Sequence, residues 1–401
     1  MKVAIVHDYL NEFGGAERVL EALCEIYPKA PIYTAFYKEG SAAHERFKKK
    51  KIITSWAQNV PFFASYLHSP LRFLAPKIWN SFSSQLADYD LVITSASWYV
   101  TKGLTQRGLR PGLLPSSRQA QGQALGRPVE ICYCHTPPRY LYGYKTARDY
   151  KKNPIINAYA VFINHFIRMY DFEAAQRVDW FVANSKEVAA RINKFYRRDS
   201  KVIYPPVDVN RFQRPVTSDQ KNNKSSNLTL AAGYFLAVSR LAGAKNVDLI
   251  VEVCKNLNLP LKVVGVGRDE GRLRKEAEST SVEILGEVDD RQLVKLYQNC
   301  RAVIFAASEE DFGIVPVEAM AAGKPVIALA EGGVLETVID GKTGVYFSPA
   351  TAGSLTLAIN NFIDLEKKGY FDPEFIRKHA QKFSKERFKR EILKFVEGKV
   401  K

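Results

Sequence analysis

Short apolar segments of strand length alternate with helix-like stretches along the chain, and this alternation limits the possible folds more than any other feature. Near-continuous apolar strands separated by helices favour a parallel sheet that is covered on both faces. In the first half we expect strands at residues 2–7, 32–36, 91–95, 130–135, 180–184 and 201–204. The pattern starts again with strands expected at 234–239, 261–266, 282–285, 302–306 and 325–328. The sequence therefore predicts an α/β protein of two doubly wound domains in series.

The polar stretch "QRPVTSDQKNNKSSN" at residues 213–227 separates the two halves and has no helical or strand period, as expected of a domain boundary. We predict an N-terminal domain at 1–212, a linker at 213–228, a second domain at 229–370, and a helical segment at 371–401 that crosses back to the first domain. Residues 104–128 are rich in Gly, Pro, Gln and Arg and have no period either. We predict a disordered insertion there, with a functional lid as the alternative.

Charge is distributed unevenly along the chain. Residues 1–200 contain 28 Lys and Arg against 16 Asp and Glu, a net charge of +12, whereas residues 251–350 contain 11 against 16, a net charge of −5. A basic domain suits an anionic partner such as nucleic acid or a membrane surface, or is simply a solvated surface. No apolar run reaches the length of a membrane-spanning helix, and the N-terminus lacks a signal-peptide pattern, so we expect a cytoplasmic protein. The 5 cysteines form no metal or disulfide pattern, and we expect reduced, buried thiols.

The stretch "EEDFGIVPVEAM" at residues 309–320 places two carboxylates around a Phe-Gly turn directly after an apolar strand. We predict a short helix that starts at Pro316 and is closed by Gly323. Its N-terminus lies at the carboxyl end of a parallel strand, where such folds bind ligands. Glu318 in the first turn can accept vicinal hydroxyls, and Glu310 projects toward the same crevice. The amides that suit a polyhydroxyl or phosphate ligand are those of Phe312, Gly313, Ile314 and Val315. Taken alone, the two carboxylates are better explained as caps of a helix start.

Further motifs follow other strands of the second half. "SRLAGAKN" supplies Arg240 and Lys245, two cations that suit a diphosphate. "VVGVGRDEGRL" at 263–273 is a weak Gly-rich fingerprint, and a tight strand-to-helix turn explains it as well. "ILGEVDD" places Gly286 and Val288 where backbone groups can edge a nucleobase. The stretch "GGVLETVIDGKTG" at 332–344 adds two loop glycines at the same edge of the sheet.

In this order the motifs resemble retaining glycosyltransferases of the GT-B type (family 4, group 1), which have two Rossmann-like doubly wound domains facing a central cleft. The family signature is a Glu, seven residues and a second Glu, with an upstream Arg and Lys. "GGAERVL" (14–20), "YCHTPPRYLYGY" (133–144) and "ANSKEVAARI" (183–192) are similar to the first domain of bacterial O-antigen and capsule mannosyltransferases. Residues 104–128 have no counterpart in this pattern.

The resemblance implies a role for each matching residue in donor binding and hexosyl transfer. Glu318 holds the ribose and Glu310 contacts the transferred sugar. Arg240 and Lys245 neutralise the departing diphosphate, which removes the need for a metal, and no Asp-x-Asp metal motif is present in the sequence. No cofactor is expected beyond a nucleotide-sugar co-substrate, either GDP-mannose or a UDP-hexose. The remaining implied roles are base contacts for Gly286 and Val288, donor contacts for Gly14 and Gly15, and a position at the reacting centre for His135. Without the family, a buried structural histidine is the better explanation of His135.

The implied acceptor is a glycan or a polyprenyl-linked glycan of cell-surface polysaccharide synthesis. "KKKK" at 48–51 precedes an aromatic and basic stretch at 52–79, which we interpret as a helix that lies in an anionic membrane interface. Burial of these apolar residues against the sheet is the alternative. Competing functions are a glycoside hydrolase, a sugar-nucleotide 2-epimerase of the same architecture and a basic nucleic-acid-binding protein. The hydrolase does not explain Arg240 and Lys245, and the aromatic residues form no stacking platform, so we expect no nucleic-acid partner.

Overall fold

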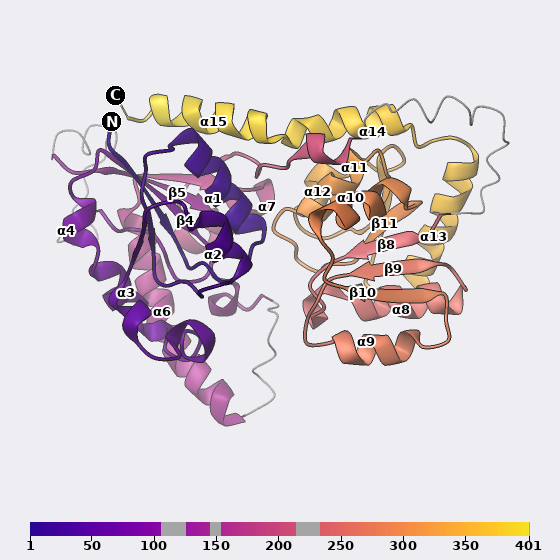
Figure 1. The fold of residues 1–401 in the computed structure, drawn as a ribbon, viewed down its shortest axis with the longest axis horizontal. Helices are drawn as coiled ribbons and strands as arrows, with labels where there is room; N and C mark the ends of the chain where they lie inside the picture. The colour runs from indigo at the N-terminus through magenta and orange to yellow at the C-terminus, as the bar shows by residue number, and fades with distance from the viewer. Residues whose placement is uncertain (106–125, 145–153, 214–232, 401) are drawn as a thin grey trace. The chain divides into compact units, whose positions relative to one another are not determined.

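The computed structural model describes residues 1–105, 126–144, 154–213 and 233–400, and it divides into two compact units (Figure 1). Unit 1 comprises Met1–Pro206 with Glu386–Lys401, and unit 2 comprises Val207–Lys385. Each unit contains one parallel sheet with helices on its faces, so the predicted α/β fold of two doubly wound domains is confirmed. The first unit ends earlier than the residue 212 that we predicted, because the Phe212 ring packs against Tyr297 of unit 2 at 5.3 Å. Most of the predicted linker lies outside the described residues.

The sheet of unit 1 has 7 strands in the order β3-β2-β1-β4-β5-β6-β7. All residues of β1, β4 and β5 are buried, as expected for strands covered on both faces. The strand order reverses between β1 and β4, which makes the carboxyl ends of these two strands the topological switch point. The strands are β1 (Val3–His7), β2 (Ile32–Thr34), β3 (Ile52–Thr54), β4 (Leu91–Ala96), β5 (Val129–Cys134), β6 (Trp180–Ala183) and β7 (Ser200–Val202).

The helices of unit 1 cover this sheet, and the last helix of the chain is one of them. Phe388, Ile392 and Val396 of the last helix join the core cluster that contains β1 and the buried face of the first helix. The residues of the C-terminal segment from Glu386 onward therefore belong to unit 1. The α-helices are α1 (Gly15–Ile26), α2 (Ala42–Phe47), α3 (Ala75–Asn80), α4 (Ser83–Leu86), α6 (Pro154–Arg177), α7 (Lys186–Tyr196) and α15 (Lys385–Glu397).

The interfacial helix predicted at residues 52–79 is wrong. Its first residues form β3, and the rest consists of short turns, η1 (Trp56–Asn59), η2 (Phe63–Leu67) and η3 (Arg72–Leu74), followed by α3. Pro61, Pro70 and Pro76 lie at intervals that prevent a continuous helix. Phe63 and Trp79 are buried in the core, which agrees with the alternative of burial against the sheet, whereas Phe62 is 72% exposed.

The sheet of unit 2 has 6 strands in the order β10-β9-β8-β11-β12-β13, with the switch point between β8 and β11. The strands are β8 (Phe235–Val238), β9 (Leu261–Val264), β10 (Val282–Gly286), β11 (Ala302–Phe305), β12 (Val326–Leu329) and β13 (Gly344–Phe347). The helical elements are η7 (Val209–Phe212), η9 (Gly243–Lys245), α8 (Val247–Asn256), α9 (Glu270–Ala277), α10 (Asp290–Asn299), α11 (Ile314–Ala321), α12 (Val334–Thr337), α13 (Ala352–Lys367), α14 (Pro373–Ala380) and η10 (Gln381–Phe383). The sequence did not predict β13, a short edge strand.

The loop after β4 is held by buried charges in unit 1. Lys102 and Asp171 form an ion pair whose side chains are 2% and 0% exposed, and the Tyr142 hydroxyl donates to the same carboxylate at 2.7 Å. The carboxylate of Glu130 accepts the backbone N–H groups of Gly103, Leu104 and Thr105 at 2.6–3.1 Å. The first residues of the predicted insertion are thus fixed to β5, and residues 106–125 lie outside the described part of the chain.

The cysteines are free and buried, as predicted, and burial raises the pKa of the Cys24, Cys132, Cys254 and Cys300 thiols to about 12. None of the described helices is both long and apolar enough to cross a membrane.

Candidate active site

Two loops meet at the switch point of unit 2, one after β8 and one after β11. The Lys245 ammonium donates to a carboxylate oxygen of Glu310 at 2.5 Å, across 65 residues of sequence. The backbone N–H of Ser308 donates to the Ala244 carbonyl at 3.0 Å, which locks the two loops together. Two of the predicted site residues are therefore in direct contact at the carboxyl edge of the sheet, where ligands bind in such folds. Arg240 lies exposed on the same β8 loop.

The turn after β11 ends in a helix that begins earlier than predicted. Gly313 has a φ of 87° and caps α11, which starts at Ile314 rather than at Pro316. The Phe312 side chain is buried and packs against Phe383 at 5.6 Å, so this residue can offer a ligand only its backbone. Ile314 and Val315 begin α11, and backbone N–H groups at a helix start can donate to an anion or a hydroxyl.

Glu318 lies in the second turn of α11, and the first-turn position that we predicted is wrong. The residue is 2% exposed, and the Tyr297 hydroxyl of α10 donates to its carboxylate at 2.8 Å. Sequence reasoning did not find Tyr297, because nothing in the pattern of α10 predicts which side chain reaches α11. Tyr297 orients the Glu318 carboxylate and leaves it capacity to accept further hydrogen bonds.

The loop glycines of unit 2 permit close backbone packing. A Cβ atom on Gly332, whose φ is 70°, would lie 2.3 Å from the Glu310 carbonyl oxygen, and one on Gly333 would lie 2.4 Å from the Asp311 carbonyl oxygen. The Gly333 N–H donates to the Glu310 carbonyl at 2.8 Å. The pair therefore buttresses the loop that carries Glu310 and leaves no room for a ligand between the two backbones.

The glycines of the turn after β9 also permit close packing of two backbone segments. Cβ atoms on Gly265 and Gly267 would lie 1.9 Å and 2.2 Å from the carbonyl oxygens of Ser239 and Leu241, on either side of Arg240. The tight-turn explanation of this motif therefore agrees with the structure. Gly286 ends β10 with a φ of 74°, and its carbonyl accepts the Gly265 N–H at 2.8 Å. Val288 follows in the next loop and is partly exposed.

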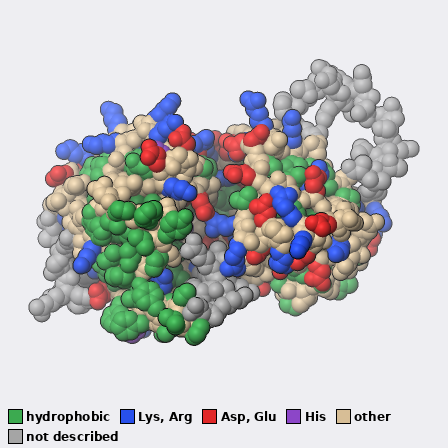
Figure 2. Space-filling model, turned by 60° about the horizontal axis from the view of Figure 1, so that its bottom comes forward, with side chains coloured by type: hydrophobic (Ala, Val, Ile, Leu, Met, Phe, Trp, Pro, Cys, Tyr) green, Lys and Arg blue, Asp and Glu red, His purple; other side chains and the backbone are tan. Residues whose placement is uncertain are grey.

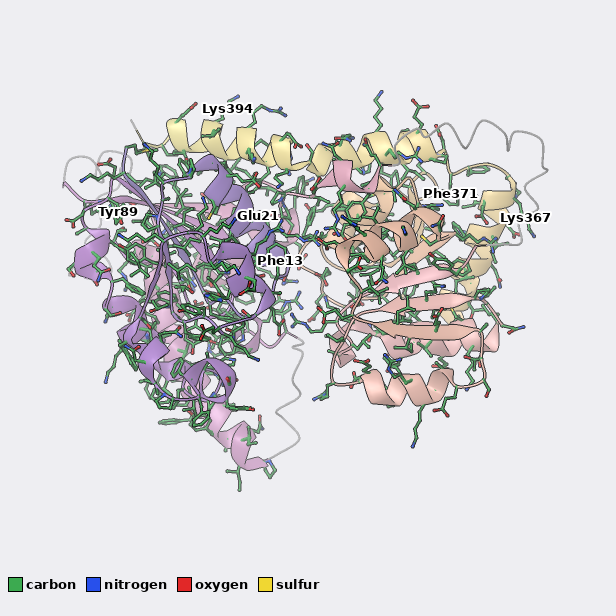
Figure 3. The ribbon with its side chains drawn as sticks, viewed as in Figure 1. Phe13, Glu21, Tyr89, Lys367, Phe371 and Lys394 are labelled. Atoms are coloured by element: carbon green, nitrogen blue, oxygen red, sulfur yellow. The ribbon has the colours of Figure 1, made fainter. Side chains whose placement is uncertain are left out.

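Gly14 and Gly15 lie at the switch point of unit 1, where the loop after β1 enters α1. Gly14 caps the helix, and its N–H is held by the Glu17 carboxylate at 2.8 Å. Arg46 of α2 contacts both Phe13 and Glu21, which are labelled in Figure 3, with its guanidinium 5.4 Å from the Phe13 ring and 2.6 Å from the Glu21 carboxylate. These contacts fix the start of the glycine loop.

His135 directly follows β5 and is 8% exposed. Its Nε2 lies 2.8 Å from the Ser95 hydroxyl of β4, and the same hydroxyl lies 3.0 Å from Nδ1 of His7 at the end of β1. Burial, with a smaller contribution from His7, lowers the pKa of His135 to about 4, so the ring is neutral at physiological pH. The sequence predicted His135 but not His7 or Ser95, which are brought to it by the register of neighbouring strands.

Helix α6 of unit 1 exposes large apolar side chains on its surface. Its buried positions, such as Ala160, Asn164 and Ile167, recur at helical spacing, yet the opposite side is also apolar. The exposed side chains there are Ile155, Tyr159, Phe162, Phe166 and Met169, together with the neighbouring Phe73. We call these residues the α6 apolar surface, and an extended hydrophobic area is visible in Figure 2. A cavity of about 430 Å³ borders the same helix, with lining residues that include Tyr140 and Arg168.

Among the described residues, no three His, Cys, Asp or Glu side chains are grouped in a way that suits a metal ion.

Comparison with known proteins gives a family-model match for part of the chain and a fold for the whole of it. Residues 218–387 match the protein-family model described as glycosyl transferases group 1. Alpha-1,3/1,6-mannosyltransferase ALG2 of Dictyostelium discoideum is 29% identical over 212 residues, which cover 44% of this chain and 50% of that protein. The chain thus spans about half the length of the first curated relatives that it matches.

Two solved structures resemble the whole chain. Anabaena HepE, solved in complex with UDP and glucose, has a TM-score of 0.69 at 20% identity and covers 99% of both chains. Sucrose-phosphate synthase from Thermosynechococcus elongatus has a TM-score of 0.71 at 18% identity and also covers 99% of both. These likenesses concern the fold, and with the two parallel-sheet domains they identify it as GT-B.

Proposed function

The second unit of this chain carries a glycosyl transferases group 1 domain within a GT-B fold, and on this premise we propose that the protein is a retaining glycosyltransferase. It moves a hexose from a nucleotide sugar to a glycan or lipid-linked acceptor of cell-surface polysaccharide synthesis. The observation that carries this proposal is the contact between Lys245 and Glu310 at the switch point of unit 2. This contact unites a cation for the diphosphate with a carboxylate for the sugar.

The proposed chemistry follows from these charges. The bond between the anomeric carbon and the donor phosphate breaks, the acceptor oxygen bonds to the same face of that carbon, and the acceptor proton passes to the departing diphosphate. Positive charge grows on the sugar beside Glu310, and negative charge grows on the phosphate beside Lys245 and Arg240. Fixed charges of this kind act without reorganisation and supply several kcal/mol of transition-state stabilisation. Because protein cations neutralise the diphosphate, no metal is required in this proposal.

Two lines of similarity bear on the donor. The Dictyostelium relative is by name a mannosyltransferase, whereas the HepE structure contains UDP and glucose. We propose GDP-mannose as the donor because the sequence relationship to the mannosyltransferase is closer than the structural likeness, which concerns the fold alone. Gly286 and Val288 then edge the base, Glu318 holds the ribose, and the amides from Phe312 to Val315 face the donor. Gly14 and Gly15 of unit 1 contribute backbone contacts to the diphosphate and sugar.

The function is tested by measuring ligand-induced stabilisation with a panel of nucleoside diphosphates and nucleotide sugars. A ligand at one hundred times its Kd should stabilise the protein by about 2.7 kcal/mol, because only the folded state binds it. We expect the largest shift in melting temperature with GDP or GDP-mannose, and an undiminished shift and undiminished sugar transfer in EDTA. Stabilisation that disappears in EDTA and returns with magnesium would disprove the metal-independent mechanism, and a panel without any shift would contradict the function itself.

Product analysis separates the proposed transfer from the 2-epimerase that shares this architecture. An epimerase would convert the donor to its isomer without an acceptor, whereas the transferase releases nucleoside diphosphate in proportion to the glycan formed.

We also propose that unit 1 docks on an anionic membrane through the α6 apolar surface, which brings the enzyme to a lipid-linked acceptor. Tyr159 donates to the Pro70 carbonyl at 2.6 Å, and Arg72 donates to Asn164 at 2.9 Å, so α6 is fixed to the neighbouring segment that carries Phe73. The exposed side of α6 carries large apolar side chains beside a few polar ones such as Arg168, and an exposed apolar surface of this kind marks a site of contact with a partner or a membrane. The net positive charge of residues 1–200 favours an anionic bilayer as that partner.

Replacing Phe162 and Phe166 together with Ser should weaken binding to vesicles that contain phosphatidylglycerol by at least about tenfold, since each buried aromatic side chain contributes roughly 1.5–3 kcal/mol. Vesicle cosedimentation measures the effect. Leu357→Ser, at an exposed apolar position on α13 of unit 2, is the matched control and should bind vesicles normally. The docking proposal is wrong if the unmodified protein does not bind vesicles. If that protein is also a dimer and the double variant is a monomer, the α6 apolar surface is a subunit interface.

A further inference from the structure

Four polar side chains form a hydrogen-bond network across the carboxyl ends of three neighbouring strands in unit 1. Glu17 of α1 lies 3.4 Å from Nε2 of His7, which is the longest contact of the network. Nδ1 of His7 lies 3.0 Å from the Ser95 hydroxyl, and that hydroxyl lies 2.8 Å from Nε2 of His135. His7, Ser95 and His135 are 2%, 0% and 8% exposed, so water does not readily replace these partners.

Glu17 determines which atom donates the proton in each hydrogen bond of this network. The second carboxylate oxygen of Glu17 accepts the Gly14 N–H at 2.8 Å, which fixes the carboxylate in place. An ionised carboxylate only accepts hydrogen bonds, so Nε2 of His7 must carry a proton. In a neutral imidazole Nδ1 is then an acceptor, and the Ser95 hydroxyl donates its proton to it. The lone pair of Ser95 is left to accept a proton from Nε2 of His135.

We propose that Glu17, His7 and Ser95 are positioning residues that fix the Nε2–H tautomer of His135 and leave its Nδ1 as an acceptor for a hydroxyl group of the transferred sugar. In the described part of the chain, Nδ1 has no hydrogen-bond partner within the protein. The low pKa of His135 agrees with this arrangement, since the ring remains neutral and able to accept. The sugar contact rests on the proposed function, whereas the tautomer does not.

The same hydrogen-bond network connects the glycine loop to His135, because Glu17 contacts both Gly14 and His7. The two parts of unit 1 to which the family resemblance assigns donor contacts are therefore coupled through buried hydrogen bonds. This coupling was not visible in the sequence, where the four residues are scattered between positions 7 and 135.

The tautomer is measured on the full chain without substrate, by long-range ¹⁵N–¹H correlation spectra of the protein labelled at its 6 histidines. His135→Gln assigns the resonances. We expect His135 to show a protonated Nε2 and a bare Nδ1. An Nδ1–H tautomer would overturn the proposal whether or not the protein transfers sugar, so its failure is distinguishable from that of the proposed function.

Kinetics of variants test the positioning role. Ser95→Ala should lower kcat by about tenfold, the effect of one lost hydrogen bond, while the Kd for free nucleoside diphosphate stays unchanged. Ser95→Thr retains a hydroxyl and should recover most of the loss. Thr94→Val removes a hydroxyl from the adjacent, equally buried position, which points to the other face of β4, and should leave kcat unchanged. Equal losses in Ser95→Ala and Thr94→Val, or a Ser95→Ala protein with normal kcat, would contradict the role.

Discussion

Replacing Glu310 with Gln should lower turnover roughly tenfold to a thousandfold, on the scale of one lost electrostatic stabiliser of the transition state. The affinity for the free nucleoside diphosphate should not fall. Glu310 contacts the sugar in the proposed mechanism, and the sugar is absent from this ligand. Moreover, Lys245 is paired with Glu310 in the structure, and the variant leaves the full charge of Lys245 available to the diphosphate. Calorimetry with the nucleoside diphosphate, combined with initial rates, measures both quantities.

Glu318→Gln is the matched control for this experiment, because it changes a carboxylate on the same loop-helix element. If Glu318 holds the ribose, the variant should weaken donor and free nucleoside diphosphate alike, a uniform loss of binding. Should Glu318→Gln lower only the melting temperature, its contact with Tyr297 is structural and the ribose role is wrong. Should Glu310→Gln lose nucleotide affinity as severely as Glu318→Gln, the proposed division of labour fails.

The second large effect concerns stability. Lys102→Met should destabilise unit 1 by roughly 3–5 kcal/mol, because it leaves the carboxylate of Asp171 buried without its cation. For a unit of this size the expected loss in melting temperature is about 6–20 °C. The double variant Lys102→Met with Asp171→Asn removes both charges and keeps an acceptor for the Tyr142 hydroxyl, so it should recover most of the loss.

Scanning calorimetry measures these changes, and Lys48→Met provides the control. Lys48 forms an ion pair with Glu45 in the same unit, but the two side chains are 52% and 50% exposed, so water screens the pair and its loss should lower the melting temperature far less than Lys102→Met does. If Lys102→Met is no worse than Lys48→Met, the Lys102–Asp171 pair does not hold the loop after β4 as described. If the double variant is as unstable as Lys102→Met, packing rather than charge explains the loss.

The sheets were predictable from the sequence because central parallel strands are buried on both faces and therefore read as apolar runs, as in Leu91–Ala96. The short edge strand β3 was missed because its residues are only partly buried and follow a basic run. The prolines at 61, 70 and 76 were visible in the sequence, and they argue against the interfacial helix that we predicted there.

The candidate site was predictable where the chemistry lies in one motif and unpredictable where it depends on register. Glu310 and Lys245 follow recognisable strands, so their meeting at the switch point of unit 2 follows from the fold. Ser95 is one of many polar residues in the chain, and only the alignment of β1, β4 and β5 places it between two histidines. The roles assigned to Phe312 and to the glycine pair at 332–333 required the packing of neighbouring loops, which no local pattern contains.

The buried thiols make the chain its own reporter of unfolding. Cys24, Cys132 and Cys134 lie in unit 1, and Cys254 and Cys300 lie in unit 2. An alkylating reagent reacts with thiolates that it can reach, and these groups become reachable only when the surrounding core opens. Mass spectrometry of the modified peptides therefore yields a separate opening free energy for each unit from a single sample. The effect of a ligand on each unit can then be read in the unmodified sequence, with no engineered probe.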